Sequence, residues 1–142
     1  MGAARVPDYS QYSNGGTGVK EIITDKKALP STSPVAQATK GGGFVFVGGQ
    51  MPRDFATGKI VEGAEVQARL SLEHCISILR EAGSGPEKVM LAIVYMTDLS
   101  HKPAVNKVFA EVFGSSPPAR NLVEVSAIGE DAIVEVGVIA LA

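Results

Sequence analysis

The sequence predicts a single α+β domain in which two helices pack on one face of a mixed β-sheet. Two long segments carry apolar residues at helical spacing, and five shorter segments are rich in β-branched and aromatic residues. Their order along the chain is ββαβαββ, which gives a two-layer architecture. A chain of 142 residues, 45% of them apolar, can bury one core of this kind without disulfides.

The first two strands are expected at residues 35–39 and 44–47. Pro34 has no N–H to donate, so it fits the position before a strand. Three consecutive glycines at 41–43 supply a turn between the two strands, and the glycine pair at 48–49 is expected to end the second.

The two helices and the other three strands follow from longer patterns. Residues 62–82 repeat apolar side chains every three or four positions, and Gly83 provides a typical helix ending. The second helix is expected to begin with Ser100 as its N-cap and to end at Gly114. The remaining strands are expected at 88–98, 119–126 and 132–141. The first of these is almost continuously apolar, which predicts burial on both of its faces.

The N-terminal segment differs in composition from the rest of the chain. Residues 1–20 are polar and rich in glycine, which predicts a flexible extension, and the folded domain is assigned to residues 21–142. No segment is apolar over a length that could span a bilayer, and the N-terminus does not resemble a signal peptide. The sequence therefore predicts a cytoplasmic protein without membrane contact.

Charge and composition argue against nucleic-acid binding. The net charge is −2, the basic residues are scattered, and the chain has no tryptophan. Phosphate backbones are usually bound by clustered Lys and Arg, and single strands by aromatic platforms. We therefore expect no nucleic-acid partner.

The residue types that build metal sites and catalytic triads are sparse. Cys75 is the sole cysteine and lies in the apolar stripe of the first helix, so it is expected to be a buried core thiol. His74, beside that stripe, is expected at the surface or its boundary, and His101 lies near the start of the second helix. Neither histidine has a Ser or Cys partner at a recognisable spacing, and two isolated histidines do not make a metal site.

The segment from Ser116 to Arg120 carries the clearest local signal for chemistry. Arg120 follows a rigid Pro-Pro pair at the start of a strand, an arrangement that presents a fixed guanidinium fork. Such a fork suits bidentate binding of a carboxylate. The alternative is a surface arginine in an ordinary salt bridge, and spacing alone favours that alternative.

Five segments taken together resemble the reactive-intermediate (enamine/imine) deaminase, or Rid, family, also called the endoribonuclease L-PSP family. They are Ser33–Ala38, Phe46–Pro52, Asp98–Asn106, Pro118–Asn121 and Val134–Ala140, and the resemblance covers residues 21–142 in order. It implies a chorismate-mutase-like fold and a homotrimer with its sites in the clefts between subunits. The implied activity is hydrolysis of reactive enamines or imines of small carboxylic acids to ketoacids and ammonia, without metal or organic cofactor.

The resemblance also assigns roles to individual residues. Arg120 matches the arginine that binds the substrate carboxylate, and Asn106 matches an asparagine near it on the second helix. Gly49 and Gln50 match the loop whose backbone lines the pocket. These four residues are therefore expected to contact the substrate.

The chain also departs from the family pattern. Val35 stands where a pocket Tyr is common, and Leu122 where a Cys is frequent. The last strand of the family is expected to read Glu-x-Glu, with the second Glu orienting water; here Glu135 matches the first and Gly137 stands at the second. On this interpretation the usual water-handling group is missing and Gly137 leaves extra room.

Two other carboxylates are candidates to replace that group, because side chains two positions apart in a strand share a face. Glu135 shares a face with Gly137, and Glu124 shares one with Arg120 and Leu122. The alternative for Glu135 is a structural ion pair at a subunit interface, and for Glu124 a solvated carboxylate.

Three classes of function remain open at this point. The first is a deaminase that binds its substrate carboxylate through Arg120. The second is a non-catalytic trimer that binds small carboxylates or acts like a chaperone, which the glycine at position 137 favours. The third is an endoribonuclease, which acidity and the few aromatic residues oppose.

Overall fold

The computed structural model describes residues 19–28 and 31–142, and within these residues the α+β class predicted from the sequence is confirmed. The strands are β1 (Glu21–Ile23), β2 (Ala38–Gly41), β3 (Phe44–Gln50), β4 (Val89–Met96), β5 (Ala119–Glu124) and β6 (Val134–Leu141). The helices are α1 (Ala64–Glu81) and α2 (Lys102–Phe113), and short 3-10 turns are η2 (Pro86–Lys88), η3 (Leu99–His101) and η4 (Gly129–Asp131).

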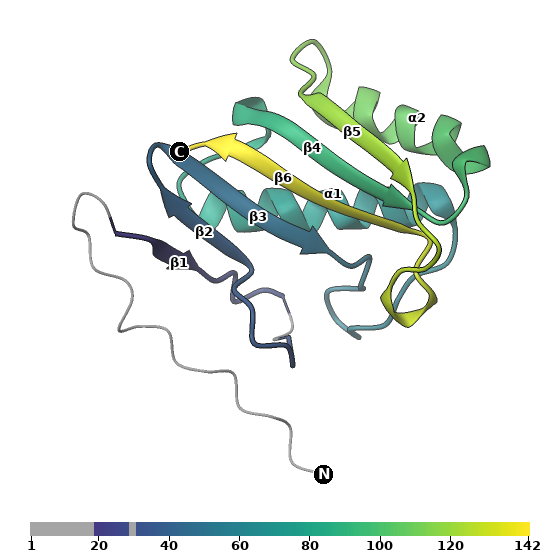
Figure 1. Cartoon of the computed structure of the whole chain (residues 1–142), viewed down its shortest axis with the longest axis horizontal. Helices are drawn as coiled ribbons and strands as arrows, with labels where there is room; N and C mark the ends of the chain where they lie inside the picture. Colours follow the sequence, from purple (N-terminus) through teal and green to yellow (C-terminus); the bar gives the residue numbers. More distant parts are fainter. Residues whose placement is uncertain (1–18, 29–30) are drawn as a thin grey trace.

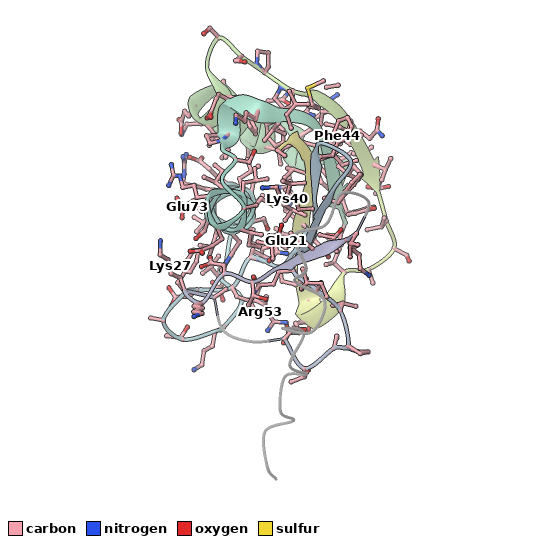
Figure 2. The ribbon with its side chains drawn as sticks, turned by 90° about the vertical axis from the view of Figure 1, so that its left-hand side faces the viewer. Glu21, Lys27, Lys40, Phe44, Arg53 and Glu73 are labelled. Atoms are coloured by element: carbon pink, nitrogen blue, oxygen red, sulfur yellow. The ribbon has the colours of Figure 1, made fainter. Side chains whose placement is uncertain are left out.

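The described strands form one sheet in the order β1-β2-β3-β6-β4-β5, with both helices on the same face (Figure 1). Strands β4 and β5 pair in parallel, and the other neighbouring strands pair antiparallel. Figure 2 views α1 nearly end-on beside the sheet, with Glu73 on the side of the helix turned away from the strands. Neither helix of the described segments is long and apolar enough to cross a membrane.

The N-terminal strands differ from their expected bounds. Strand β2 begins at Ala38 rather than at Val35, whose side chain is exposed, and β1 adds a strand that three residues were too few to reveal. Strand β3 continues through the two glycines to Gln50, with a register shift between Val47 and Gln50 where it pairs with β6. Most of the predicted extension lies outside the described residues, because only Val19 and Lys20 of it are described.

The helices agree with their predicted patterns in most respects. Gly83, with φ of 79°, follows the end of α1 as expected, and Cys75 is fully buried in the core as predicted. The start of α2 differs, because His101 rather than Ser100 stands at its N-cap and makes no side-chain cap, and Asp98 caps the preceding η3. The Asp98 carboxylate accepts a hydrogen bond from the Ser100 backbone N–H at 2.8 Å, so η3 forms before α2 begins.

Burial on β4 differs from the prediction. Ala92, Val94 and Met96 face the helices and are fully buried, whereas Tyr95 on the opposite face is 36% exposed. That opposite side of the sheet, which we call the open sheet face, is apolar over its centre. It presents Phe46, Ile93, Tyr95, Val123 and Ile139, which share this side through their pairing registers. Within one chain, therefore, β4 is buried on one face only.

Candidate functional site

Arg120 lies near the start of β5 and points towards α2. Its Nη2 donates a hydrogen bond to Oδ1 of Asn106 at 2.8 Å, and its guanidinium carbon lies 4.8 Å from the ring centroid of Phe109. A cation over an aromatic face is attracted to it, and the amide oxygen fixes the plane of the fork. Arg120 and Asn106, which the family resemblance places together, are thus in direct contact.

The guanidinium of Arg120 is held by these neutral groups alone. The ion pairs of the described residues involve other cations, so no carboxylate within them lies within 4.0 Å of Arg120. The ordinary intrachain salt bridge, the alternative that spacing favoured, is absent there. Partial burial lowers the pKa of Arg120, yet an arginine remains charged at neutral pH. Its other N–H donors are available to a ligand carboxylate.

Glu135 lies on β6 and faces the opposite way, onto the open sheet face beside Tyr95. Its carboxylate rests on the backbone of Gly49 in β3. A Cβ at position 49 would overlap Oε1 of Glu135, and it would lie 3.0 Å from the carboxyl carbon. Burial raises the pKa of the Glu135 carboxyl above its ordinary value of 4.5.

The extra room expected at Gly137 is not present, and that expectation is wrong. A Cβ at position 137 would lie 3.1 Å from the carbonyl oxygen of Val47 and 3.3 Å from the backbone nitrogen of Gly49. The backbone of β3 therefore already occupies the space into which a side chain at 137 would point. On this face of β6, Glu135 is the residue whose carboxylate lies against the β3 backbone, at Gly49.

Glu124 has a local structural contact. Its Oε1 accepts a hydrogen bond from the backbone N–H of Leu99 at 3.1 Å, at the start of η3. It shares the helix side of β5 with Arg120, as predicted, and Leu122 lies between them against the core. The carboxylate of Glu124 therefore lies on the opposite side of the sheet from Glu135 and caps a turn.

The segments before β2 and after β3 enclose a cavity of about 640 Å³. Val35, Gly49 and Gln50, three of the residues expected in the substrate pocket, line it. Sequence reasoning missed Arg53 and Glu130, which also line it and form an ion pair, with Nη1 donating to Oε1 at 2.9 Å. No local pattern could have joined these two residues, because 77 positions separate them.

His74 also lines this cavity, and its expected surface position is wrong. The side chain is buried, with 5% of the residue exposed. Its Nε2 lies 2.6 Å from the carbonyl oxygen of Arg53, and its ring stacks on Phe55 at 3.9 Å between centroids. The loop after β3 covers this side of α1, a contact that helical periodicity cannot predict.

The single chain does not bring the two halves of the expected site together. Arg120 pairs with Ala92 on the helix side of the sheet, whereas Glu135 pairs with Tyr95 on the open face. Strand β4 separates β5 from β6, a distance of about 10 Å across the sheet. Neither Arg120 nor Asn106 lines the cavity beside Gly49. A substrate that contacts both Arg120 and Glu135 would have to lie between two chains.

The described residues offer no metal ligand cluster. No three His, Cys, Asp or Glu side chains within them are arranged to hold a metal ion. Cys75 is enclosed in the core, with Sγ 3.3 Å from the carbonyl oxygen of Val136, and burial raises the pKa of its thiol. A thiol in that environment is unsuited to act as a nucleophile.

Comparison with known proteins identifies the family of this chain. The family model described as endoribonuclease L-PSP matches residues 25–142. A RutC family protein of Pyrococcus abyssi is 42% identical over 122 residues, which is 85% of this chain and 96% of the relative. The 3-aminoacrylate deaminase RutC of Acinetobacter baylyi is 34% identical, over 85% of this chain and 97% of its own. A crystal structure of a Rid family protein from Yersinia pestis superposes with a TM-score of 0.84 at 33% identity, covering 87% of this chain and all of the other. The chain therefore belongs to the Rid, or endoribonuclease L-PSP, family.

Proposed function

We propose that this protein hydrolyses a reactive enamine or imine of a small carboxylic acid to the corresponding ketoacid and ammonia. The named activity of the Acinetobacter relative, a 3-aminoacrylate deaminase, supports this class of reaction. The observation that carries the proposal concerns the environments of Arg120 and Glu135. Arg120 has a fixed fork without an acidic partner in the described chain, and Glu135 has a partly buried carboxyl of raised pKa.

Arg120 binds the carboxylate of the substrate. Asn106 and Phe109 hold the guanidinium, so the remaining N–H groups can donate to both carboxylate oxygens. This contact orients the substrate and lowers the entropic cost of reaching the reactive geometry.

Glu135 handles the proton of the attacking water. An enamine first takes a proton from solvent on carbon and becomes the iminium, and water then adds to the iminium carbon. The Glu135 carboxylate accepts the proton that this water loses, which leaves a neutral carbinolamine, and returns it to nitrogen. The carbon–nitrogen bond then breaks, and the departing ammonia takes the hydroxyl proton as the carbonyl forms, so the products are the ketoacid and ammonium. A raised pKa brings Glu135 closer to the operating pH, where an acid–base group is most effective.

The site is completed in this proposal between subunits of a homotrimer. Arg120 and Glu135 lie on opposite faces of one sheet, so a substrate that touches both must contact two copies of the chain. The open sheet face supplies an apolar surface for such an assembly, since Phe46 and Val123 are each 46% exposed. Light scattering at micromolar concentration is expected to give a mass near three chains, and a monomer would contradict the shared site.

A mixing experiment tests the shared site and the activity together. Arg120→Lys and Glu135→Gln are each expected to be nearly inactive on imines generated by an amino acid oxidase, as judged by ammonia release. When the two variants are coexpressed in equal amounts, about one quarter of the shared sites contain both intact groups. Activity should therefore return to about a quarter of that of the unmodified protein. A mixture as inactive as its components would contradict a site built from two chains.

A second candidate function is binding of small carboxylates without turnover. The observation that favours it is that Arg120, Asn106 and Phe109 are already assembled within one chain, independently of Glu135. Calorimetric binding of pyruvate that depends on Arg120, in a trimer that releases no ammonia from any imine, would support this function over the deaminase.

A further inference from the structure

We propose that Gly49 is a positioning residue for Glu135: the missing side chain at position 49 is what allows the Glu135 carboxylate to rest on Gly49, a residue of the cavity wall. The role of this contact in catalysis rests on the proposed function above. The contact itself can be tested without it.

The geometry at Gly49 identifies the reason for glycine there. The three nearest atoms to an added Cβ all belong to Glu135: it would overlap Oε1 and lie 3.0 Å from the carboxyl carbon and 3.4 Å from Cγ. The backbone at Gly49 has no positive φ, in contrast to Gly42 and Gly43 in the preceding turn. Any residue could therefore adopt its conformation, and the requirement for glycine is one of space.

No ionic contact explains the position of Glu135. Within the described residues Glu135 takes part in no ion pair. Tyr95 is its pairing partner on β4, and the charge of Glu135 adds to the raised pKa of the Cys75 thiol, which lies in the core on the helix side of the sheet. On β3 its neighbour Gln50 is uncharged and donates to the carbonyl oxygen of Gly48 at 3.0 Å. Steric fit against Gly49 is thus the contact that places this carboxylate.

The contact has a chemical consequence because Gly49 lines the cavity of about 640 Å³. A carboxylate lying on Gly49 is shielded on one side by the β3 backbone, and Gly49 itself borders the cavity. This partial desolvation is the cause of the raised pKa of Glu135. If the carboxylate were moved into water, it would lose both its position and its altered acidity.

Gly49→Ala is the direct test. The added methyl group meets the far end of a flexible side chain, so we expect the fold to persist and the Glu135 carboxylate to move away. A positioned general base contributes about a hundred- to ten-thousandfold, so kcat should fall by about tenfold or more. KM should stay within about threefold, because Arg120 is unchanged. The acidic limb of the kcat profile should shift to lower pH, as should the titration of the Glu135 carboxyl followed by ¹³C NMR.

Gly48→Ala is the matched control for the titration. Its added Cβ would lie 3.6 Å from the carbonyl oxygen of Gln37, an ordinary van der Waals contact, and it would not touch Glu135. We expect Gly48→Ala to leave the titration of Glu135 unchanged. An unchanged titration in Gly49→Ala as well would overturn the proposal. A shifted titration with an unaltered kcat would confirm the contact and overturn its role in catalysis.

Two further measurements distinguish the positioning role of Gly49 from a failure of the proposed hydrolysis and from a purely structural role of this glycine. If the unmodified protein hydrolyses no imine, the proposed function fails, but the NMR titration still decides whether Gly49 places Glu135. If Gly49→Ala lowers the melting temperature, the same substitution in a Glu135→Ala background should lower it much less, because the overlapping atoms are gone. An equal loss in both backgrounds would show that Gly49 serves the backbone and not Glu135.

Discussion

Replacing Gly137 with alanine is expected to destabilise the fold by about 1–3 kcal/mol, the usual cost of adding a methylene to a well-packed region. The new Cβ would lie 3.1 Å from the carbonyl oxygen of Val47, 3.3 Å from the nitrogen of Gly49 and 3.5 Å from the carbonyl carbon of Gly48. All three are backbone atoms of β3, so they cannot rotate away as the end of a side chain can. Relief would require β3 and β6 to separate at their register shift.

The measurement is equilibrium unfolding by heat and by urea at a fixed protomer concentration. For a chain of this size, about 1 kcal/mol shifts the melting temperature by about 3 °C. Gly41→Ala is the matched control, because no atom lies within 4 Å of its added Cβ and its φ is not positive. If Gly137→Ala were as stable as Gly41→Ala, the close approach of β3 to β6 would be refuted. Gly137→Glu carries the same Cβ, so we expect it to lose stability and to gain no hydrolysis.

Four further predictions concern three charged residues. Arg120→Lys keeps the positive charge but loses the planar guanidinium fork. Loss of one charge-assisted hydrogen bond costs about 1.5–3 kcal/mol, so the Kd for pyruvate measured by calorimetry should rise by about ten- to a hundredfold. An unchanged Kd would exclude Arg120 as the residue that binds the carboxylate. Because Glu135 must be ionised to accept a proton and its pKa lies above 4.5, kcat should fall as the pH drops through that raised pKa, and in Glu135→Gln any residual rate should lack this limb. Since the pKa of Glu135 is raised in the folded state, the protonated carboxyl favours folding below pH 4.5, and this contribution is lost as the pH rises through the folded pKa. At neutral pH the buried charge is therefore unfavourable. Glu135→Gln should thus be more stable than the unmodified protein at neutral pH but not at pH 4. Glu124→Ala should cost about 1 kcal/mol in urea unfolding through loss of the contact with Leu99, and its kcat should match that of the unmodified protein if the carboxylate acts only as a cap.

The elements that could be predicted from the sequence are those whose pattern is long enough to exclude other interpretations. Helix α1 spans 18 residues and α2 spans 12, and in both cases a glycine follows at the end of the apolar stripe. Strand β1 has three residues, fewer than two periods of alternation, so nothing in its sequence separates it from a loop. The start of η3 illustrates a different limit, since Asp98 and Ser100 are both good capping residues and the choice between them depends on the turn that precedes α2.

The candidate site was predictable to the extent that its contacts are local in sequence. Arg120 and Asn106 lie 14 positions apart on adjacent elements, and the resemblance to the Rid family is what places them together before the structure does. The contact between Glu135 and Gly49 joins β6 to β3, and its evidence in the sequence is a glycine that reads as a strand breaker. The glycine pair at 48–49 is therefore expected to end the strand, although β3 continues through it to Gln50.

The position of Gly137 shows why a missing residue type is weak evidence for a missing function. In the sequence, Gly137 stands where a glutamate is expected, and this indicates a pocket that lacks a carboxylate side chain and has extra room. In the structure, Gly137 allows the β3 backbone to approach β6, and that approach brings Gly49 beneath the carboxylate of Glu135. A glycine on each strand thus has a separate part in one arrangement: Gly137 accommodates the backbone and Gly49 accommodates the acid. The absence of a second glutamate on β6 is consequently compatible with hydrolysis, because the carboxylate that remains is the one held against Gly49.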